Sequence, residues 1–255
     1  MTSDKKLKLI IRLIGISLIS QMLISLPVWV SSVREFPTAP VIDGLNYGRF
    51  GVLLFFILIG LLVYLLIKPL NRLVILSIIG IFFLLVLEDQ SRLQPWLYLY
   101  SFMLLGVVFY KQENRTTHSL QGILLILSLS YFWSGVQKMN FFFGNEMFPW
   151  LAEFTGQKAW LDQHPEVAYW IGGTEALAGL MLLFRRSRKA GAIVILLTHL
   201  FILISLGPMG HNWNHVVWPW NICFASMLIL LVWSPAPTAL IVRSRYYLFC
   251  TLFIG

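Results

Sequence analysis

The sequence has little charge and almost no cysteine. Charged residues make up 12% of the 255 residues, about half of the roughly 25% that soluble domains carry. Hydrophobic residues make up 58%, more apolar surface than a soluble core of this size hides, so lipid is the expected solvent. The two cysteines, Cys223 and Cys250, lie far apart in apolar runs, which argues against a disulfide framework and a thiolate metal site.

Acidic residues are scarce as well, with 11 against 19 basic residues and a net charge of +8. The basic residues lie in short loops between apolar runs, as is typical of membrane proteins, so we expect no nucleic-acid partner. Lys5, Lys6 and Lys8 precede a long apolar run without a clear small-residue cleavage site. This pattern predicts a retained first helix and no cleaved signal peptide.

Eight apolar segments approach the length of about 20 residues that a membrane-crossing helix needs. They predict an all-α, polytopic transmembrane helical bundle of about eight helices, forming one membrane domain over residues 1–255. The tail Tyr246–Gly255 is apolar but too short to span, and is either an interfacial segment or the start of a ninth helix. The eight segments are 9–30, 50–67, 73–87, 96–110, 119–137, 167–184, 190–207 and 216–233.

The basic residues are distributed unevenly between alternate loops. Of the 19, 14 fall on the side of the N-terminus, and Arg34, Arg49, Arg92, Lys138 and Lys158 fall on the other. Basic loops stay in the cytoplasm, so both termini are predicted to be cytoplasmic. The 14 residues are Lys5, Lys6, Lys8, Arg12, Lys68, Arg72, Lys111, Arg115, Arg185, Arg186, Arg188, Lys189, Arg243 and Arg245.

Two polar clusters are predicted on the outer face at the ends of apolar runs. Arg92 lies in the short turn 88–96, where it either pairs with Glu88 or Asp89 in a plain hairpin or shapes a pocket. Lys138 directly follows an apolar helix in the segment 131–140. It is either a lysine that extends to the membrane surface or a partly desolvated amine that can accept a proton.

Two more clusters involve an intramembrane acid and three histidines. Glu175 and His199 lie within apolar helices at similar predicted depth, and form either a functional site or a hydrogen bond that joins two helices. His211 and His215 are four residues apart, a spacing that suits a metal on a helix. The motif contains no Glu, so no metal site is predicted, and anchoring by tryptophans at the interface is the alternative.

The segment Tyr131–Asn140 (YFWSGVQKMN) resembles the lysine-bearing segment of the HTTM domain, the membrane domain of the vitamin K-dependent gamma-carboxylase and its bacterial relatives. Looser similarities are Glu175 followed by the Arg-rich segment 185–188, and His199 followed by Trp218-Pro219. The resemblance covers about residues 85–235. We expect these 255 residues to form the membrane domain alone, without the large lumenal domain of the true carboxylase, so protein gamma-carboxylation is not expected.

The resemblance implies a lysine base that deprotonates a reduced quinone of the vitamin K type. By this resemblance Lys138 is the candidate base, His199 a hydrogen-bond partner of the resulting anion, and Glu175 and Arg92 shape the pocket. Aromatic surroundings suit a quinol-type ligand, and the candidate residues that bind it are Trp133, Asn140, His215 and Trp218.

Two functions follow as alternatives. One is an HTTM-type, carboxylase- or oxidoreductase-like enzyme of the bacterial inner (plasma) membrane, acting on a lipophilic small molecule at the outer leaflet. The other is a non-catalytic membrane subunit or scaffold that docks a periplasmic or membrane protein partner. A transporter is less well supported, since no repeated pair of broken helices is seen.

Overall fold

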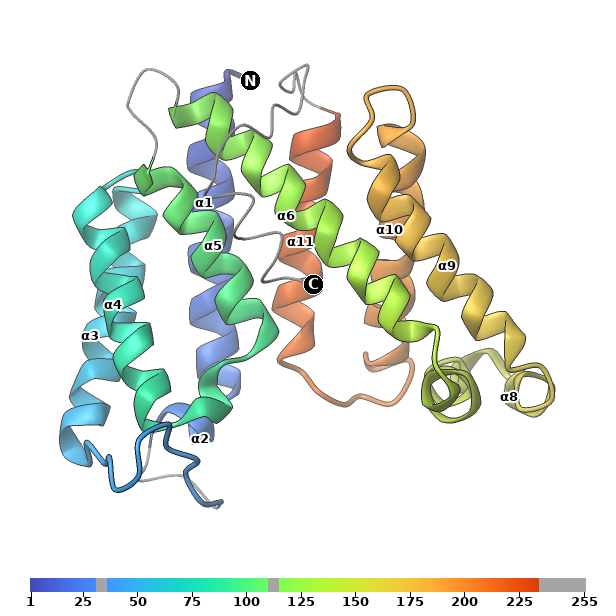
Figure 1. Ribbon diagram of the computed structural model, residues 1–255, viewed down its shortest axis with the longest axis horizontal. Helices are drawn as coiled ribbons and strands as arrows, with labels where there is room; N and C mark the ends of the chain where they lie inside the picture. The colour runs from blue at the N-terminus through green and yellow to red at the C-terminus, as the bar shows by residue number, and fades with distance from the viewer. Residues whose placement is uncertain (31–35, 110–114, 234–255) are drawn as a thin grey trace. The chain divides into compact units, whose positions relative to one another are not determined.

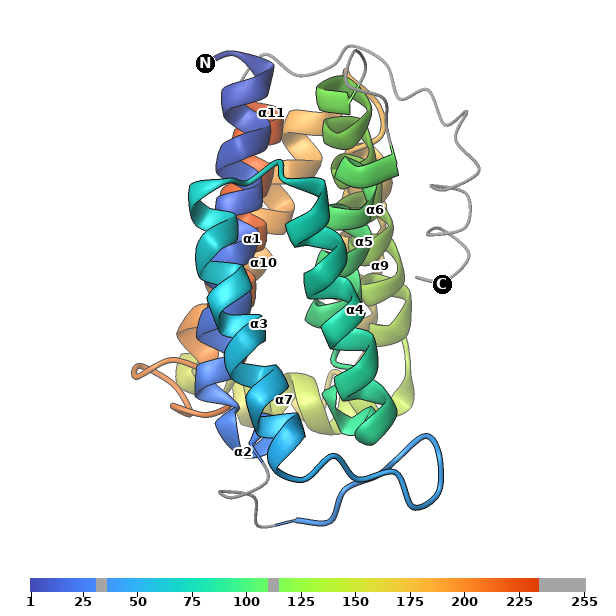
Figure 2. The same cartoon turned by 90° about the vertical axis from the view of Figure 1, so that its left-hand side faces the viewer.

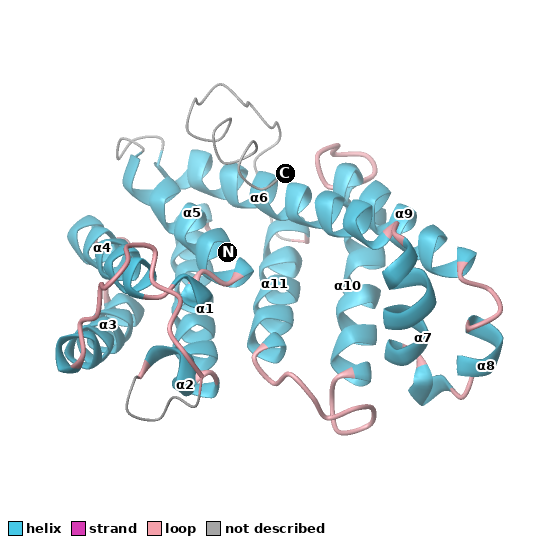
Figure 3. Ribbon diagram, turned by 60° about the horizontal axis from the view of Figure 1, so that its bottom comes forward, coloured by secondary structure: helices cyan, strands magenta, loops and turns pink. Residues whose placement is uncertain are grey.

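The computed structural model describes residues 1–30, 36–109 and 115–233, and these ranges contain helices and loops but no strand (Figure 3). The all-α prediction is therefore confirmed for this part of the chain. The chain divides into two compact units, Met1–Ser119 and Leu120–Gly255. Whether residues 1–255 act as one membrane domain stays a prediction.

Eight helices of 15 residues or more occupy the eight predicted apolar segments within the described ranges. Four of them, α1, α3, α6 and α10, are long and apolar enough to cross a membrane, and α5 and α11 are apolar but shorter. The number of spans and the orientation stay predictions. The helices are α1 (Ser3–Ile24), α3 (Arg49–Ile67), α4 (Arg72–Glu88), α5 (Pro95–Phe109), α6 (Arg115–Lys138), α9 (Glu166–Met181), α10 (Arg188–Ser205) and α11 (Val217–Val232).

The predicted first segment, 9–30, differs from the helix that forms. Helix α1 begins earlier, at Ser3, because the Thr2 side chain accepts a hydrogen bond from the Lys5 backbone N–H and so caps the first turn. It ends at Ile24, and the short helix α2 (Leu26–Trp29) follows with Pro27 in its first turn. Proline is tolerated there but not inside a continuous helix, which explains the break.

The first unit is a ring of four helices in which α1 contacts α3, α3 contacts α4, α4 contacts α5 and α5 contacts α1 (Figures 1 and 2). The ring encloses a polar contact between helices α1 and α5. There the Ser17 hydroxyl lies 2.9 Å from the Tyr100 hydroxyl and donates to Gln21 Oε1 at 3.0 Å. Such bonds join helices in an apolar surrounding.

The second unit contains α9, α10, α11 and most of α6. Helix α10 contacts both α9 and α11, and the Tyr131 ring of α6 meets the Phe224 ring of α11 edge-on. Helices α6 and α9 approach closely through three glycines, Gly135, Gly172 and Gly179, which we call the glycine contact. Small residues let helix backbones approach in this way.

The connection between α6 and α9, residues 139–165, forms four short helical elements. They are η3 (Phe143–Met147), α7 (Phe148–Leu151), η4 (Glu153–Thr155) and α8 (Lys158–Leu161). In Figure 1, α8 lies at the end of the unit where α9 begins. Phe148, Ala152 and Leu161 pack with Ala168 of α9 into a small apolar core, which fixes this connection against the helices.

Large apolar side chains are exposed on helices of both units, for example Phe56, Leu73 and Leu177. Exposed apolar surface of this kind suits contact with lipid. Several predicted features lie outside the described residues, namely Arg34, Lys111, Arg243, Arg245, Cys250 and the segment Tyr246–Gly255.

Candidate functional site

Lys138 and Glu175 form an ion pair in the second unit, which we call the acid–base pair. Lys138 is the last residue of α6, and its Nζ donates to Glu175 Oε2 on α9. It also donates to the Ser134 hydroxyl, one turn earlier, at 3.2 Å. The Glu175 side chain is 4% exposed and that of Lys138 22% exposed. The lysine is therefore directed toward a buried carboxylate while one side of it remains accessible.

The glycine contact positions this pair. A Cβ at Gly135 would lie 2.4 Å from the Gly172 carbonyl oxygen and 2.4 Å from the Ala176 backbone nitrogen. A Cβ at Gly172 would lie 3.1 Å from the Lys138 Cβ. Only glycine fits at these two positions, and the lysine therefore lies across the surface of α9 and reaches Glu175, one turn further along that helix.

Beside the pair, Tyr131, His199 and Asn221 form a buried hydrogen-bonded group, which we call the histidine group. Asn221 donates through its amide to the Val217 carbonyl at 2.8 Å, so its Oδ1 accepts from His199 Nδ1, 2.6 Å away. His199 Nε2 then accepts from the Tyr131 hydroxyl at 2.7 Å. This pattern belongs to a neutral imidazole with its proton on Nδ1.

The sequence left open a direct hydrogen bond between Glu175 and His199, but the structure gives each residue other partners. Glu175 bonds to Lys138, whereas His199 bonds to Tyr131 and Asn221. The two sets remain linked, because Tyr131, Ser134 and Lys138 follow at intervals of three and four residues on α6. Glu175 also interacts electrostatically with His199. His199 thus lies close to the acid–base pair without contacting its carboxylate directly.

Glu175 also lines a cavity of about 420 Å³ between α9 and α10, which we call the α9–α10 cavity. Its walls are mostly apolar, and Thr174, Glu175 and Thr198 are the residues with hydroxyl or carboxyl groups among those that line it. Trp170 and Leu197 at its edge are 76% and 60% exposed, so it opens on the outer surface of these two helices. The apolar lining residues are Phe148, Val167, Trp170, Ile171, Val194, Leu197 and Phe201.

A second hollow of about 450 Å³ shares Phe148 and Phe201 with this cavity. It extends along the short helices α7 and α8, where Trp160 and Leu161 contribute to its lining. The two hollows together suit an elongated ligand with a compact polar end near Glu175 and an apolar remainder.

Arg92 lies in the first unit, in the short helix η2 (Gln90–Arg92). It donates to Glu88 Oε2 at 2.7 Å, to the Leu85 carbonyl at 2.8 Å and to the Val28 carbonyl at 3.0 Å. These bonds match the plain hairpin alternative, in which Arg92 pairs with Glu88. Its predicted part in shaping the pocket stays a prediction.

The four residues predicted to bind a cofactor are dispersed within the second unit. Trp133 packs edge-on against Phe132, and the exposed Asn140 bonds to the Gln137 carbonyl and the Phe143 N–H. His215 and Trp218 contact each other at 5.5 Å between ring centroids. These four are not among the residues that line the α9–α10 cavity.

His211 and His215 do not lie on a helix, because the loop between α10 and α11 is irregular and Asn212 and Asn214 have positive φ angles of 47° and 53°. His211 stacks on Trp150 at 4.0 Å and hydrogen-bonds to its carbonyl at 2.7 Å. Within the described ranges no group of three His, Cys, Asp or Glu residues is placed to hold a metal.

Sequence reasoning did not assign roles to several residues that the structure brings to the site. The sequence does give a reason to include Ser134, since it lies one turn before Lys138 on the same predicted helix. It also gives a reason to include Asn221, as an amide within an apolar helix. It gives none for the lining residues Thr174, Phe148 and Phe201, because a cavity depends on how three helices pack.

A comparison of the chain with protein-family models, curated proteins and solved structures gives no match. The resemblance to the HTTM domain therefore stays a prediction from the segments quoted above.

Proposed function

We propose that the chain is a multi-pass protein of the bacterial inner membrane, with both termini cytoplasmic, and that it is an HTTM-type enzyme acting on a lipophilic hydroxyl compound of the quinol class. The acid–base pair and the α9–α10 cavity form its site. The observation that carries this proposal is that Glu175 both lines the cavity and bonds to Lys138. An ionisable residue in this setting is a functional hypothesis by default.

The cavity suits such a ligand. Its volume of about 420 Å³ falls in the range of roughly 300–1,000 Å³ that small-molecule sites occupy. Aromatic walls fit a flat ring, and the carboxylate and two threonine hydroxyls supply the few polar groups that fix its orientation. The exposed edge at Trp170 and Leu197 lets a lipophilic molecule enter from the lipid, and the second hollow accommodates an apolar tail.

A reduced quinone, when bound, supplies a hydroxyl proton and reducing equivalents. In this proposal the carboxylate of Glu175, a residue that lines the cavity, accepts that proton as the hydroxyl O–H bond breaks. The pair, neutral before this step, then consists of a protonated acid beside an ammonium group and carries one positive charge, which stabilises the anion left in the cavity. In a later step Lys138 releases a proton to water on its exposed side and accepts the proton held by Glu175, which returns the pair to its neutral state.

This mechanism changes the role first expected of Lys138. Lys138 was expected to take the substrate proton itself, whereas in this proposal Glu175, which lines the cavity, takes it first and Lys138 receives it from Glu175. The histidine group holds the other side of α6 in place, since His199 donates to Asn221 and accepts from Tyr131. In this proposal His199 acts through Tyr131 and does not donate directly to the substrate anion.

The test uses purified full-length protein in detergent with a short-chain menaquinone as the probe. Binding is measured by calorimetry. Turnover is measured as oxygen uptake after reduction of the quinone, since in this proposal dioxygen takes the two electrons and two protons of the quinol and leaves as hydrogen peroxide. We expect Glu175→Gln and Lys138→Gln to retain binding and to lower oxygen uptake by about 100-fold or more, the usual contribution of a general base. Lys158→Gln is the matched control, since Lys158 is an exposed lysine of the same unit that pairs with Asp162.

Uptake that is unchanged in Lys138→Gln removes the base assignment. Wild-type protein that does not bind the quinone removes the quinol class.

The competing function, a non-catalytic subunit or scaffold, is favoured by one observation. The acid–base pair lies beside the glycine contact, where an ion pair joins two closely packed helices. On this alternative both substitutions lower the temperature of thermal unfolding, and wild-type protein shows no quinol-dependent oxygen uptake.

A further inference from the structure

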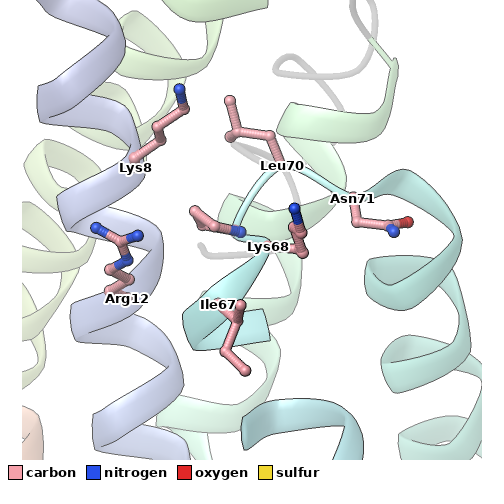
Figure 4. Close-up of a pocket in the computed structure, with 7 residues that line it drawn as sticks. Lys8, Arg12, Ile67, Lys68, Leu70 and Asn71 are labelled. Carbon is pink, nitrogen blue, oxygen red and sulfur yellow. The ribbon is translucent and has the colours of Figure 1, made fainter. Parts of the chain in front are cut away.

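The first unit contains a basic pocket that the proposed function does not use. It has a volume of about 450 Å³ and lies between α1 and the turn that joins α3 to α4. Lys8 and Arg12, one turn apart on α1, face the turn that carries Lys68 and Asn71 (Figure 4). None of the residues that line it is acidic.

The polar side chains that line this pocket can all act as hydrogen-bond donors. Arg12 Nε donates to the Leu66 carbonyl at 2.9 Å, which fixes the plane of the guanidinium, and this bond does not use the two terminal nitrogens. Asn71 accepts from the Leu73 and Val74 N–H groups at the start of α4, so its amide NH₂ is not needed for the cap. Three cations and an amide donor form a surrounding suited to an oxyanion.

The surroundings of the pocket are apolar. Ile67, in its lining, is 64% exposed, and Ile16, one turn beyond Arg12 on α1, is 51% exposed. Exposed apolar side chains directly beside a cluster of cations match the two parts of a phospholipid, whose phosphate is anionic and whose chains are apolar. Basic pockets between membrane helices are known to hold anionic head groups.

We propose that this pocket binds a phosphate group, with Lys8, Arg12 and Lys68 as its cationic contacts, and that an anionic phospholipid is the form in which the phosphate is presented. The predicted orientation places the pocket in the cytoplasmic leaflet, where anionic lipids attract basic residues. The proposal does not depend on the chemistry of the acid–base pair in the second unit.

The test is native mass spectrometry of the full-length protein in detergent, titrated with phosphatidylglycerol and, separately, with phosphatidylcholine. We expect phosphatidylglycerol to bind more tightly. Arg12→Gln and Lys68→Gln should each weaken it about fivefold, since one basic residue near an anionic surface contributes about that factor. Lys5→Gln is the matched control, since Lys5 is an exposed lysine of the same helix that does not line the pocket.

A variant that should strengthen phosphatidylglycerol binding adds a second test. Lys8 forms a salt bridge with Asp4 at 2.6 Å, and this acid competes with a phosphate for the lysine. Asp4→Asn should therefore tighten phosphatidylglycerol binding.

Inorganic phosphate distinguishes the two sources of the phosphate group. If it displaces phosphatidylglycerol at millimolar concentration, the pocket recognises free phosphate, and if it does not, the lipid is the ligand. Equal affinities for both lipids, or equal losses in Arg12→Gln and Lys5→Gln, would overturn the proposal.

Discussion

The two units each place a cation beside a buried acid, but the two arrangements differ in what surrounds them. In the first unit, Arg92 is bonded to Glu88 and to two backbone carbonyls. Glu88 in turn accepts from the Tyr47 N–H at 2.7 Å, and Asp89 from the Ala39 N–H at 3.2 Å. These bonds fasten the loop before α3 to the turn after α4.

In the second unit the acid–base pair has a different environment. Lys138 is partly accessible, and Glu175 lines the α9–α10 cavity. A charge cluster whose bonds go to backbone groups stabilises a turn, whereas a pair that contacts both a cavity and solvent can exchange a proton with a ligand. The comparison shows that buried charge indicates a candidate site only when one of its atoms reaches a space that a ligand can fill.

The largest expected effect is on the Arg92 cluster. Arg92→Met removes a cation that is 2% exposed and leaves Glu88 and Asp89 buried without it. Breaking a buried ion pair in this way costs about 3–5 kcal/mol. Thermal unfolding in detergent checks this value, with Arg49→Met as the control, since Arg49 is exposed at the start of α3. A loss under about 1 kcal/mol would show that the cluster does not hold the turn.

Substitutions in the acid–base pair should lower the free energy of unfolding less than Arg92→Met does, and the two members of the pair should differ. Lys138→Met leaves the Glu175 carboxylate buried without its partner and should lower the free energy of unfolding by about 2–3 kcal/mol. The loss is no larger because the buried acid can become protonated and so neutral. Glu175→Gln costs about 1 kcal/mol, since Lys138 can turn its amine toward its accessible side. Unfolding curves of the two variants, measured side by side, give the comparison. Equal losses would contradict the asymmetric exposure on which the proton path rests.

The sequence predicted the helices better than it predicted the partners of their polar residues. Long apolar runs set the helices, and their bounds follow the predicted segments within a few residues, apart from the first helix, which begins six residues earlier and breaks near Pro27. The Arg92–Glu88 pair was foreseen as an alternative because its members are four residues apart. The Lys138–Glu175 pair joins residues 37 apart, across four short helical elements. Its geometry depends on the close approach at Gly135 and Gly172, which no local pattern reveals.

The glycine contact offers a way to disturb the acid–base pair without changing either charge. Gly135→Ala introduces a Cβ into a space already filled by the backbone of α9, so α6 and α9 must separate, at a cost of about 1–3 kcal/mol. Gly60→Ala is the matched control, since nothing lies within 4 Å of a Cβ there. It should stabilise its helix by roughly 0.5–1 kcal/mol. Loss of stability in both variants would show that helix propensity, and not the close approach, governs the result.

The smallest effect is expected at an exposed pair that serves as a reference for the two buried arrangements. Glu166, the first residue of α9, has a lowered pKa because its carboxylate accepts a hydrogen bond from its own backbone N–H and another from His164. A carboxylate with a lowered folded-state pKa stabilises the fold above its unfolded-state pKa, and this contribution is lost as the pH falls through the folded-state value.

Glu166→Gln should therefore lower the unfolding temperature slightly at pH 7, and the difference from wild type should vanish below the usual glutamate pKa of 4.5. Thermal unfolding measured across this pH range tests the sign. Because Glu166 is exposed, its contribution is screened by salt, so the difference at pH 7 should shrink as ionic strength rises. The difference caused by Arg92→Met should persist, because its charges are buried. A Glu166→Gln difference that grows toward acidic pH would reverse the sign and remove the assignment.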